Sequence, residues 1–313
     1  MAADIKLNTE ENLTPEEVLA KAEEELSDSD ESNEVPPLDI VAFSEHKSCA
    51  DLLRLFKSGK LKIEPDYQRE IVWPAANQTR FIDSLAKRLP IPSMCISLDY
   101  RTDKREVVDG LQRIASIIKF LDDREWRLSK LDDIDPRISN KTVEYLENEE
   151  SDLYERVRDT SIPVTVIRCD LSKRSHQEYL FTIFHRLNTG GAKLSNQEIR
   201  NCIYNGPFNN LLKAVVSTPE YKTLFNIIPN KKYRYSNEEM VLRILSHVDD
   251  PDLYKAPLTK HLNSFMSYKK DIDETVSSNV TAIVLRAINI VYTKVFNSEP
   301  MPKLSKATIE ALF

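Results

Sequence analysis

Glycine is scarce in this sequence, and its scarcity excludes several classes of protein. The 313 residues contain 5 glycines, whereas average usage of about 7% predicts roughly 22. Collagen-like repeats, glycine linkers and glycine-rich phosphate loops are therefore excluded together. The positions of the few glycines are informative for the same reason: they are Gly59, Gly110, Gly190, Gly191 and Gly206.

Cysteines are few, and long apolar runs are absent. The four cysteines Cys49, Cys95, Cys169 and Cys202 form no Cys-x-x-Cys pair, which argues against a zinc cluster or a disulfide scaffold, so we expect buried, reduced thiols. The most apolar late stretch, AIVLRAINIVY, is broken by Arg286 and is too short to span a membrane. The first residues show no secretory signal. We therefore expect a cytoplasmic protein with no membrane partner.

Charge is distributed unevenly along the chain. The net charge is -7, but residues 1–36 carry 12 acidic and 2 basic residues. The remaining residues carry 41 basic and 38 acidic side chains, a net charge of +3. The overall acidity therefore does not argue against a ligand that bears phosphate groups.

The sequence predicts three regions. Residues 1–37 form an acidic, largely disordered appendage with a short helix, because Thr14-Pro15-Glu16-Glu17 has the pattern of a capped helix start. Residues 38–170 alternate short strands and amphipathic helices, and residues 171–313 have helical periodicity almost throughout. We therefore expect an α+β fold with a small mixed sheet, followed by an all-helical part.

Several local signals place the elements of these regions. Ser48 and Asp51 are expected to cap a helix that stops at Gly59. Strands are expected at LKI, SMCISLDY, KREVVDG and IPVTVIRCD. A long helix is expected to bury Phe81, Ile82, Leu85 and Leu89, and three later helices begin with the capping-box pairs Ser175 and Glu178, Ser195 and Glu198, and Ser236 and Glu239.

The strongest local signal for chemistry is a strand, a tight turn and a helix in the segment VVDGLQR. Gly110 permits a close approach of the backbone, and the start of the helix offers free N–H groups to a phosphate, with Arg113 in the first turn. In the structural alternative Asp109 caps the helix and Arg113 pairs with a surface carboxylate. The segment by itself does not decide between the two.

Two further segments carry polar residues that suit a binding site. In DYQREIVW, Gln68 and Arg69 can face a pocket while Tyr67 and Trp73 pack at the edge of a loop. In FHRLNTGG a helix ends in an Asn-Gly turn, for which an ordinary helix C-cap is also an explanation. Each of these segments alone favours a structural role.

Together the three segments resemble a known family. YQREIVWP, VVDGLQR and FHRLNTGGAKLSNQEIRN have the order and spacing of the N-terminal domain of GmrSD-type restriction endonucleases, a member of the ParB/sulfiredoxin superfamily. The resemblance covers residues 45–215. It implies a ParB/sulfiredoxin-like nucleotide-binding domain at residues 38–170, in which binding and hydrolysis of a nucleoside triphosphate gate the cleavage of phage DNA.

Carried over by position, the resemblance assigns nine site residues. Arg69 and Arg113 would neutralise phosphate charge, while Asp109 and Gln112 would orient Mg²⁺ or water. The catalytic residues would be Asp109, Gln112 and Arg113, and the nucleotide-binding residues Gln68, Arg69, Gly110, Leu111, Phe184 and Asn188. The implied partners are a nucleoside triphosphate, DNA and a separate nuclease subunit. No resident metal site is expected.

The sequence also departs from the family. The usual DGQQR reads DGLQR, with Leu111 in place of a glutamine, so hydrolysis is weakened only if that side chain contacts the nucleotide. No cysteine stands in the turn, which argues against the chemistry of sulfiredoxin. No HNH-type nuclease unit follows residue 215, and Asp39 with Glu45 and Lys47 fits a nuclease carboxylate motif in letters only.

Two functional hypotheses therefore stay open. The first is a nucleoside triphosphatase that regulates a modification-dependent restriction or anti-phage system. The second is a non-catalytic module of the same fold that binds DNA or protein. A phosphotransferase with Glu70 as its carboxylate is a third, weaker reading, and the basic and aromatic residues of YKTLFNIIPNKKYRYSNEEM suit either nucleic-acid contact or ordinary packing.

Overall fold

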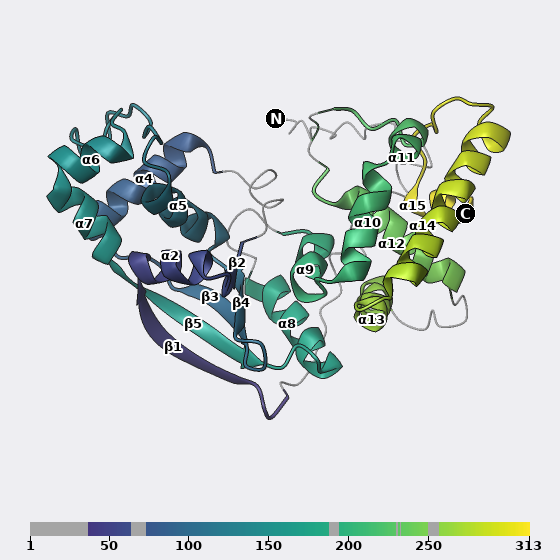
Figure 1. Ribbon diagram of the computed structural model, residues 1–313, viewed down its shortest axis with the longest axis horizontal. Helices are drawn as coiled ribbons and strands as arrows, with labels where there is room; N and C mark the ends of the chain where they lie inside the picture. Colours follow the sequence, from purple (N-terminus) through teal and green to yellow (C-terminus); the bar gives the residue numbers. More distant parts are fainter. Residues whose placement is uncertain (1–36, 64–72, 188–193, 230, 232, 250–256) are drawn as a thin grey trace, which may run out of the picture. The chain divides into compact units, whose positions relative to one another are not determined.

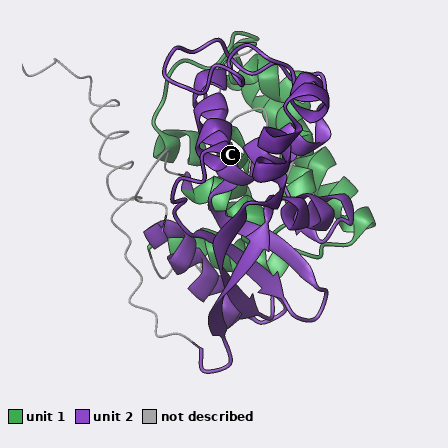
Figure 2. Cartoon of the chain, turned by 90° about the vertical axis from the view of Figure 1, so that its left-hand side faces the viewer, with its two compact units in different colours: residues 1–33, 196–313 green, residues 34–195 purple. Residues whose placement is uncertain are grey.

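The computed structural model describes most of the chain beyond the acidic appendage. The described residues are 37–63, 73–187, 194–229, 231, 233–249 and 257–313. The predicted helix near Thr14 lies outside them. The chain divides into two compact units, one ending at Ser195 and the other formed by residues 196–313 (Figure 2). The first unit extends past residue 170, where the predicted nucleotide-binding domain ends.

The first unit is built on a five-stranded mixed sheet of order β1-β5-β3-β4-β2 (Figure 1). The strands are β1 (Val41–Ser48), β2 (Leu61–Lys62), β3 (Met94–Asp99), β4 (Lys104–Asp109) and β5 (Ser161–Cys169). β1 with β5 and β3 with β4 are antiparallel, whereas β3 with β5 and β2 with β4 are parallel. The predicted α+β class with a small mixed sheet is confirmed.

Strand β1 was not among the predicted strands. Its sequence VAFSEHKS has no apolar alternation beyond Val41 and Phe43, and both of these are exposed. The strand lies at the sheet edge and pairs only with β5, from Val41 opposite Arg168 to Ser48 opposite Ser161. Because the long-range pairing determines this strand, local pattern could not reveal it.

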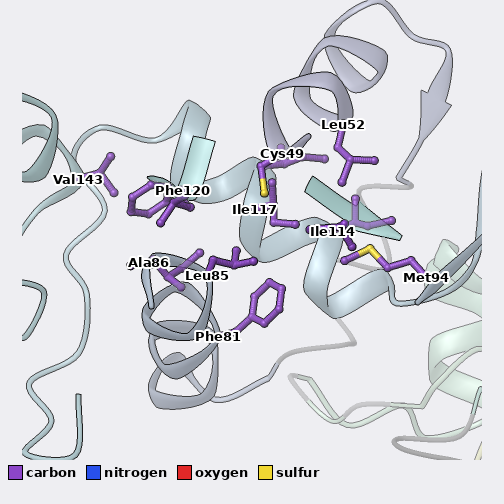
Figure 3. Close-up of a cluster of buried hydrophobic side chains, with 14 of the residues drawn as sticks. Cys49, Leu52, Phe81, Leu85, Ala86, Met94, Ile114, Ile117, Phe120 and Val143 are labelled. Carbon is purple, nitrogen blue, oxygen red and sulfur yellow. The ribbon is translucent and has the colours of Figure 1, made fainter. Parts of the chain in front are cut away.

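One layer of helices packs on the sheet around a common core. These helices are α2 (Cys49–Lys57), α4 (Ala75–Ala86), α5 (Leu111–Asp122), α6 (Val143–Glu149) and α7 (Ser151–Asp159). Figure 3 shows buried side chains of this core, including Phe81, Ile114 and Phe120 from the helices and Met94 from β3. A further helix, α8 (Arg174–Leu187), packs against β4.

Local sequence explains where α2 begins and which residues α4 buries. The Ser48 hydroxyl accepts a hydrogen bond from the Asp51 N–H, and the Asp51 carboxylate accepts from the Ser48 N–H, which confirms the predicted cap of α2. Helix α4 buries Phe81, Ile82 and Leu85 as predicted. The prediction that Leu89 belongs to this helix is wrong, because α4 ends at Ala86 and Leu89 is exposed.

The buried thiols confirm the expectation for the cysteines. Cys49, Cys95 and Cys169 are free and buried, and Cys202 is free and partly buried. Burial raises the pKa of the first three thiols to about 12. A thiol with so high a pKa is almost entirely protonated at neutral pH, so these three cysteines fill space rather than react.

The second unit is helical, as predicted for the C-terminal part. Its elements are α9 (Asn196–Ile203), α10 (Pro207–Ser217), α11 (Pro219–Leu224), α12 (Ser236–Asp249), α13 (Leu258–Lys269), α14 (Glu274–Ile290), the π-helical turn η3 (Val291–Val295) and α15 (Lys306–Glu310). Helix α10 packs against α12 and α14, and α9 packs against α12 and α13.

A buried polar network joins α9 to its neighbours. The Arg200 side chain is 1% exposed and donates to Asn263 Oδ1 at 2.8 Å, Gln197 Oε1 at 3.1 Å and Glu239 Oε2 at 3.2 Å. Burial works to raise the pKa of Glu239, but the cations of Arg200, Lys306 and Arg243 outweigh it and hold that pKa below its usual value. Arg200 is therefore a charged residue of the core that is hydrogen-bonded to Asn263, Gln197 and Glu239.

Two of the predicted capping glutamates form ion pairs with residues distant in the sequence. Glu239 belongs to the Arg200 network, and the fully buried Glu198 accepts a hydrogen bond from Arg234 at 2.6 Å. The predicted cap at Ser175 is wrong, because α8 already begins at Arg174, which pairs with Glu178. The Ser-x-x-Glu pattern thus marked helix starts correctly to within a residue in α9 and α12, although tertiary ion pairs recruit the glutamates.

Helices α14 and η3 form one continuous helix from Glu274 to Val295. It has 22 residues and a mean hydropathy of 1.2, so it is long and apolar enough to cross a membrane by length and composition alone. The expectation of no membrane contact rested on the shorter stretch around Arg286 and stays a prediction. Only 17% of the apolar window is buried within the protein.

We predict that Arg200→Met destabilises the protein by about 3 kcal/mol, since it leaves Glu239 buried without its closest cation. Urea unfolding followed by circular dichroism measures the change. Arg54→Met is the matched control, because Arg54 is exposed and its loss should cost less than about 0.5 kcal/mol. Equal effects of the two substitutions would contradict a structural role for the network.

Candidate functional site

The segment VVDGLQR forms the predicted strand, turn and helix. β4 ends at Asp109, Gly110 is the N-cap with φ of 90°, and α5 begins at Leu111. A Cβ on Gly110 would lie 2.9 Å from Met94 Cγ and 3.1 Å from Arg113 Nη2. Because Met94 is completely buried, its side chain has little room to yield. Glycine is therefore required here for both its backbone conformation and the close approach.

No side chain among the described residues caps the start of α5. The first intrahelical hydrogen bond runs from the Ile114 N–H to the Gly110 carbonyl at 2.9 Å, and Asp109 makes no capping bond. The N–H groups of Leu111, Gln112 and Arg113 thus have no partner within the helix. Such a helix start, with its partial positive charge, suits an anion.

The Arg113 guanidinium is held beside this helix start by three oxygens. Nη2 lies 2.9 Å from Asp109 Oδ2 and 3.4 Å from the Ser93 carbonyl, while Nη1 donates to the Pro92 carbonyl at 2.5 Å. The Arg113 side chain is 14% exposed and that of Asp109 41%. The pairing of Arg113 with a carboxylate, as the structural alternative expected, is present, whereas the cap by Asp109 is not.

Gln112 connects the first two sequence motifs. Its Oε1 accepts a hydrogen bond from the Trp73 N–H at 3.0 Å, and Gln78 Nε2 donates to the Trp73 carbonyl at 2.9 Å. The Trp73 ring packs edge-on against Phe81 at 5.7 Å between centroids. Gln68 and Arg69 lie outside the described residues. Trp73, the last residue of the segment DYQREIVW, is nonetheless hydrogen-bonded to Gln112, which follows the turn at Asp109 and Gly110.

Leu111 resolves part of the question raised by the altered DGQQR motif. Its side chain is partly buried and packs against the hydrophobic core, to which Ile114 and Ile118 also belong. Ile114 and Ile118 follow Leu111 by three and seven positions, so all three residues lie on one face of α5. The leucine side chain therefore serves packing, and only its backbone N–H belongs to the helix start.

The third motif contributes Phe184 to the described residues, while Asn188 lies outside them. Phe184 is 1% exposed on α8, the helix that packs against β4. Its side chain is therefore part of the protein interior. Residues that the sequence reasoning missed are Met94 at the start of β3 and the carbonyls of Pro92 and Ser93 just before it, which contact Gly110 and Arg113. No local pattern signals such long-range contacts.

The carboxylate motif of Asp39, Glu45 and Lys47 does not form a metal site. Asp39 accepts hydrogen bonds from Lys173 and from His176 Nε2, and these bonds lower its pKa to about 2. Glu45 pairs with Lys47 at 2.9 Å on β1. Within the described part of the chain, no group of three histidine, cysteine or carboxylate side chains is arranged to hold a metal ion.

The basic and aromatic segment after α10 is mainly engaged in packing. Tyr221 is completely buried and stacks on Phe225 at 4.2 Å between centroids, and Tyr235 is 5% exposed. Arg234 is paired with Glu198. These contacts agree with ordinary packing of the segment. The rings of Tyr221 and Tyr235 are buried and therefore cannot stack on the bases of a nucleic acid.

Comparison with known protein families agrees with the geometry. Residues 51–205 match the family described as GmrSD restriction endonuclease, N-terminal domain. This segment is a GmrSD N-terminal domain. The GmrSD domain includes Trp73, the Asp109–Arg113 turn and Phe184. Comparison with curated proteins and with solved structures finds no match.

We predict that Gly110→Ala destabilises the GmrSD domain more than Gly59→Ala does. Both glycines have positive φ, but a Cβ on Gly59 would have no neighbour within 4 Å. Alanine at Gly59 should cost about 1 kcal/mol from the backbone alone, whereas alanine at Gly110 should cost about 2–4 kcal/mol because crowding adds to it. Urea unfolding measures both, and equal costs would show that the contact with Met94 is not limiting.

Proposed function

We propose that the protein binds and hydrolyses a nucleoside triphosphate and thereby regulates a modification-dependent restriction or anti-phage defence system. One observation carries the proposal: Gln112 bonds the Trp73 backbone at 3.0 Å and so joins two motifs at an uncapped helix start. Membership of residues 51–205 in the GmrSD N-terminal domain family supports the link to restriction. The regulated nuclease would be a separate subunit.

In this proposal the phosphates bind at the start of α5. The N–H groups of Leu111, Gln112 and Arg113 supply neutral donors, and the Arg113 guanidinium supplies charge. Asp109 and the backbone carbonyls hold that guanidinium in place, so little side-chain entropy is lost on binding. The residues proposed to complete the pocket are Gln68, Arg69, Gly110 and Asn188. Phe184 is 1% exposed, so its proposed contribution is through packing.

Magnesium would arrive with the nucleotide. Mg²⁺ usually keeps several waters and takes one or two carboxylates plus phosphate oxygens. Asp109 can supply such a carboxylate. Its Oδ2 binds Arg113, and because the side chain is 41% exposed, its other oxygen is the one suited to Mg²⁺. Gln112 uses Oε1 to bind Trp73, so its Nε2 amide is the end suited to hold a water or a phosphate oxygen.

A non-catalytic module that binds DNA or protein is the alternative function. The full set of partners around Arg113 favours it, because a phosphate must compete with Asp109 and two carbonyls for the guanidinium. Leu111 does not favour it, since that side chain packs on the core. Calorimetric titration separates the two: a DNA-binding module should ignore nucleotides and show steep salt dependence with DNA.

Replacement of Arg113 tests the proposed function. We predict that Arg113→Met lowers triphosphate turnover by roughly 100-fold, since the guanidinium is the main positive charge at the site. The assay measures phosphate release from a panel of nucleoside triphosphates with Mg²⁺, with and without DNA. Arg54→Met, an exposed change on α2 of the same unit, is the control and should keep wild-type turnover. Equal rates for Arg113→Met and wild type would contradict the proposed role of Arg113 in triphosphate hydrolysis.

A further inference from the structure

Helix α14 carries an apolar stripe that the fold of the second unit leaves uncovered. One side of the helix holds the buried residues Val284 and Ile288 and packs on α10 and α11 (Figure 1). Val276, Ile283 and Ile290 lie seven residues apart on another side and are 49%, 66% and 49% exposed. On a helix this spacing places all three on one stripe. Three exposed branched side chains in heptad register are the pattern of a helix that pairs with another helix.

Charges of opposite sign mark the two ends of the same helix. Glu274 and the N-cap residue Asp273 are exposed at its start, and Lys294 is exposed at its end, in η3. Residues 275–295 contain two cations, Arg286 and Lys294, and no acidic residue. Neither cation forms an ion pair with a described residue. A partner that covers the stripe should therefore be acidic where it meets Lys294 and basic where it meets Glu274.

A second copy of α14 in the antiparallel direction has this chemistry. When the two Ile283 side chains meet on a two-fold axis, Val276 of each copy faces Ile290 of the other, because both lie seven residues from the centre. Along the helix axis, Lys294 lies about 16 Å and Glu274 about 14 Å from Ile283. Each Lys294 therefore meets the acidic start of the other copy. The stripe is thus complementary to itself, as a symmetric interface requires.

The parallel direction does not fit the charges. Two parallel copies in register would place each Arg286 and each Lys294 beside the same residue of the other copy, and like charges side by side are unfavourable. In the antiparallel pair the two Arg286 residues lie about 9 Å apart along the axis, on either side of the centre. The charges therefore select the antiparallel direction.

A membrane is the other cover that the apolar composition of this helix allows. Arg286 lies near the middle of the helix, and its side chain is exposed, as are those of Asn279 and Asn289. A charged side chain near the centre of a bilayer is costly, whereas at the edge of a helix pair it can stay in water. The polar residues therefore favour a protein partner.

We propose that two copies of the protein form a symmetric dimer through α14, with the helices antiparallel and Ile283 at the two-fold axis. The helix has 22 residues, so the contact is about 33 Å long and about 10 Å wide. Such a strip is smaller than the roughly 800 Å² that each partner buries in a standard interface. We therefore expect a weak dimer that dissociates at micromolar concentrations. The interface includes no residue of the proposed nucleotide site.

Analytical ultracentrifugation of the full chain at a series of concentrations tests the proposal. We expect Ile283→Asp to raise the dissociation constant of the dimer roughly tenfold or more, because two carboxylates then meet at the axis. The matched control is Val248→Asp on α12 of the same unit, where the valine is 60% exposed. It should leave the dissociation constant at the wild-type value. Both variants alter exposed side chains, so both should keep the wild-type melting temperature.

A charge exchange tests the antiparallel direction. Lys294→Glu should raise the dissociation constant about fivefold, since by symmetry it removes two ion pairs, and adding Glu274→Lys should restore the wild-type value. A monomer at every concentration, equal dissociation constants for wild type and Ile283→Asp, or no restoration by Glu274→Lys would each overturn the proposal. It would also be overturned if the wild type were monomeric and bound phosphatidylserine vesicles while Ile283→Asp did not.

Discussion

The contact between Gly110 and Met94 is the constraint on which the candidate site depends. A side chain at Gly110 would come within 2.9 Å of Met94 Cγ, so the end of β4 can lie this close to β3 only with glycine. That approach sets where α5 begins, and with it the direction of three N–H groups that have no partner within the helix. Arg113 reaches the carbonyls of Pro92 and Ser93 from the same position. The close contact of Gly110 with Met94 thus positions both the core around β3 and the proposed binding residues at the start of α5.

Local sequence was a good guide where neighbours in the chain determine the structure. The strand, turn and helix around Gly110 and the cap at Ser48 follow from residues within four positions of one another, and both were predicted. Strand β1 and the carbonyl acceptors of Arg113 at Pro92 and Ser93 depend on residues far away in the sequence, and they were not predicted. The mixed sheet was predictable in kind, although not in its strand order.

The third motif illustrates how one segment can serve two units. Phe184 on α8 is buried in the first unit, whereas Gln197 and Arg200 on α9 belong to the buried polar network of the second. The family resemblance implied that Phe184 and Asn188 of this segment bind the nucleotide. Arg200, further along the same segment, is buried with three partners and is therefore held for stability and not for contact with a ligand.

The central claim is that triphosphate binds at the start of α5. A crystal structure of the full chain with a non-hydrolysable nucleoside triphosphate and Mg²⁺ is the most direct test. The account predicts phosphate oxygens about 3 Å from the N–H groups of Leu111 to Arg113 and within hydrogen-bonding distance of the Arg113 guanidinium. Phosphates bound at another place, with Arg113 still held only by Asp109 and the two carbonyls, would contradict it.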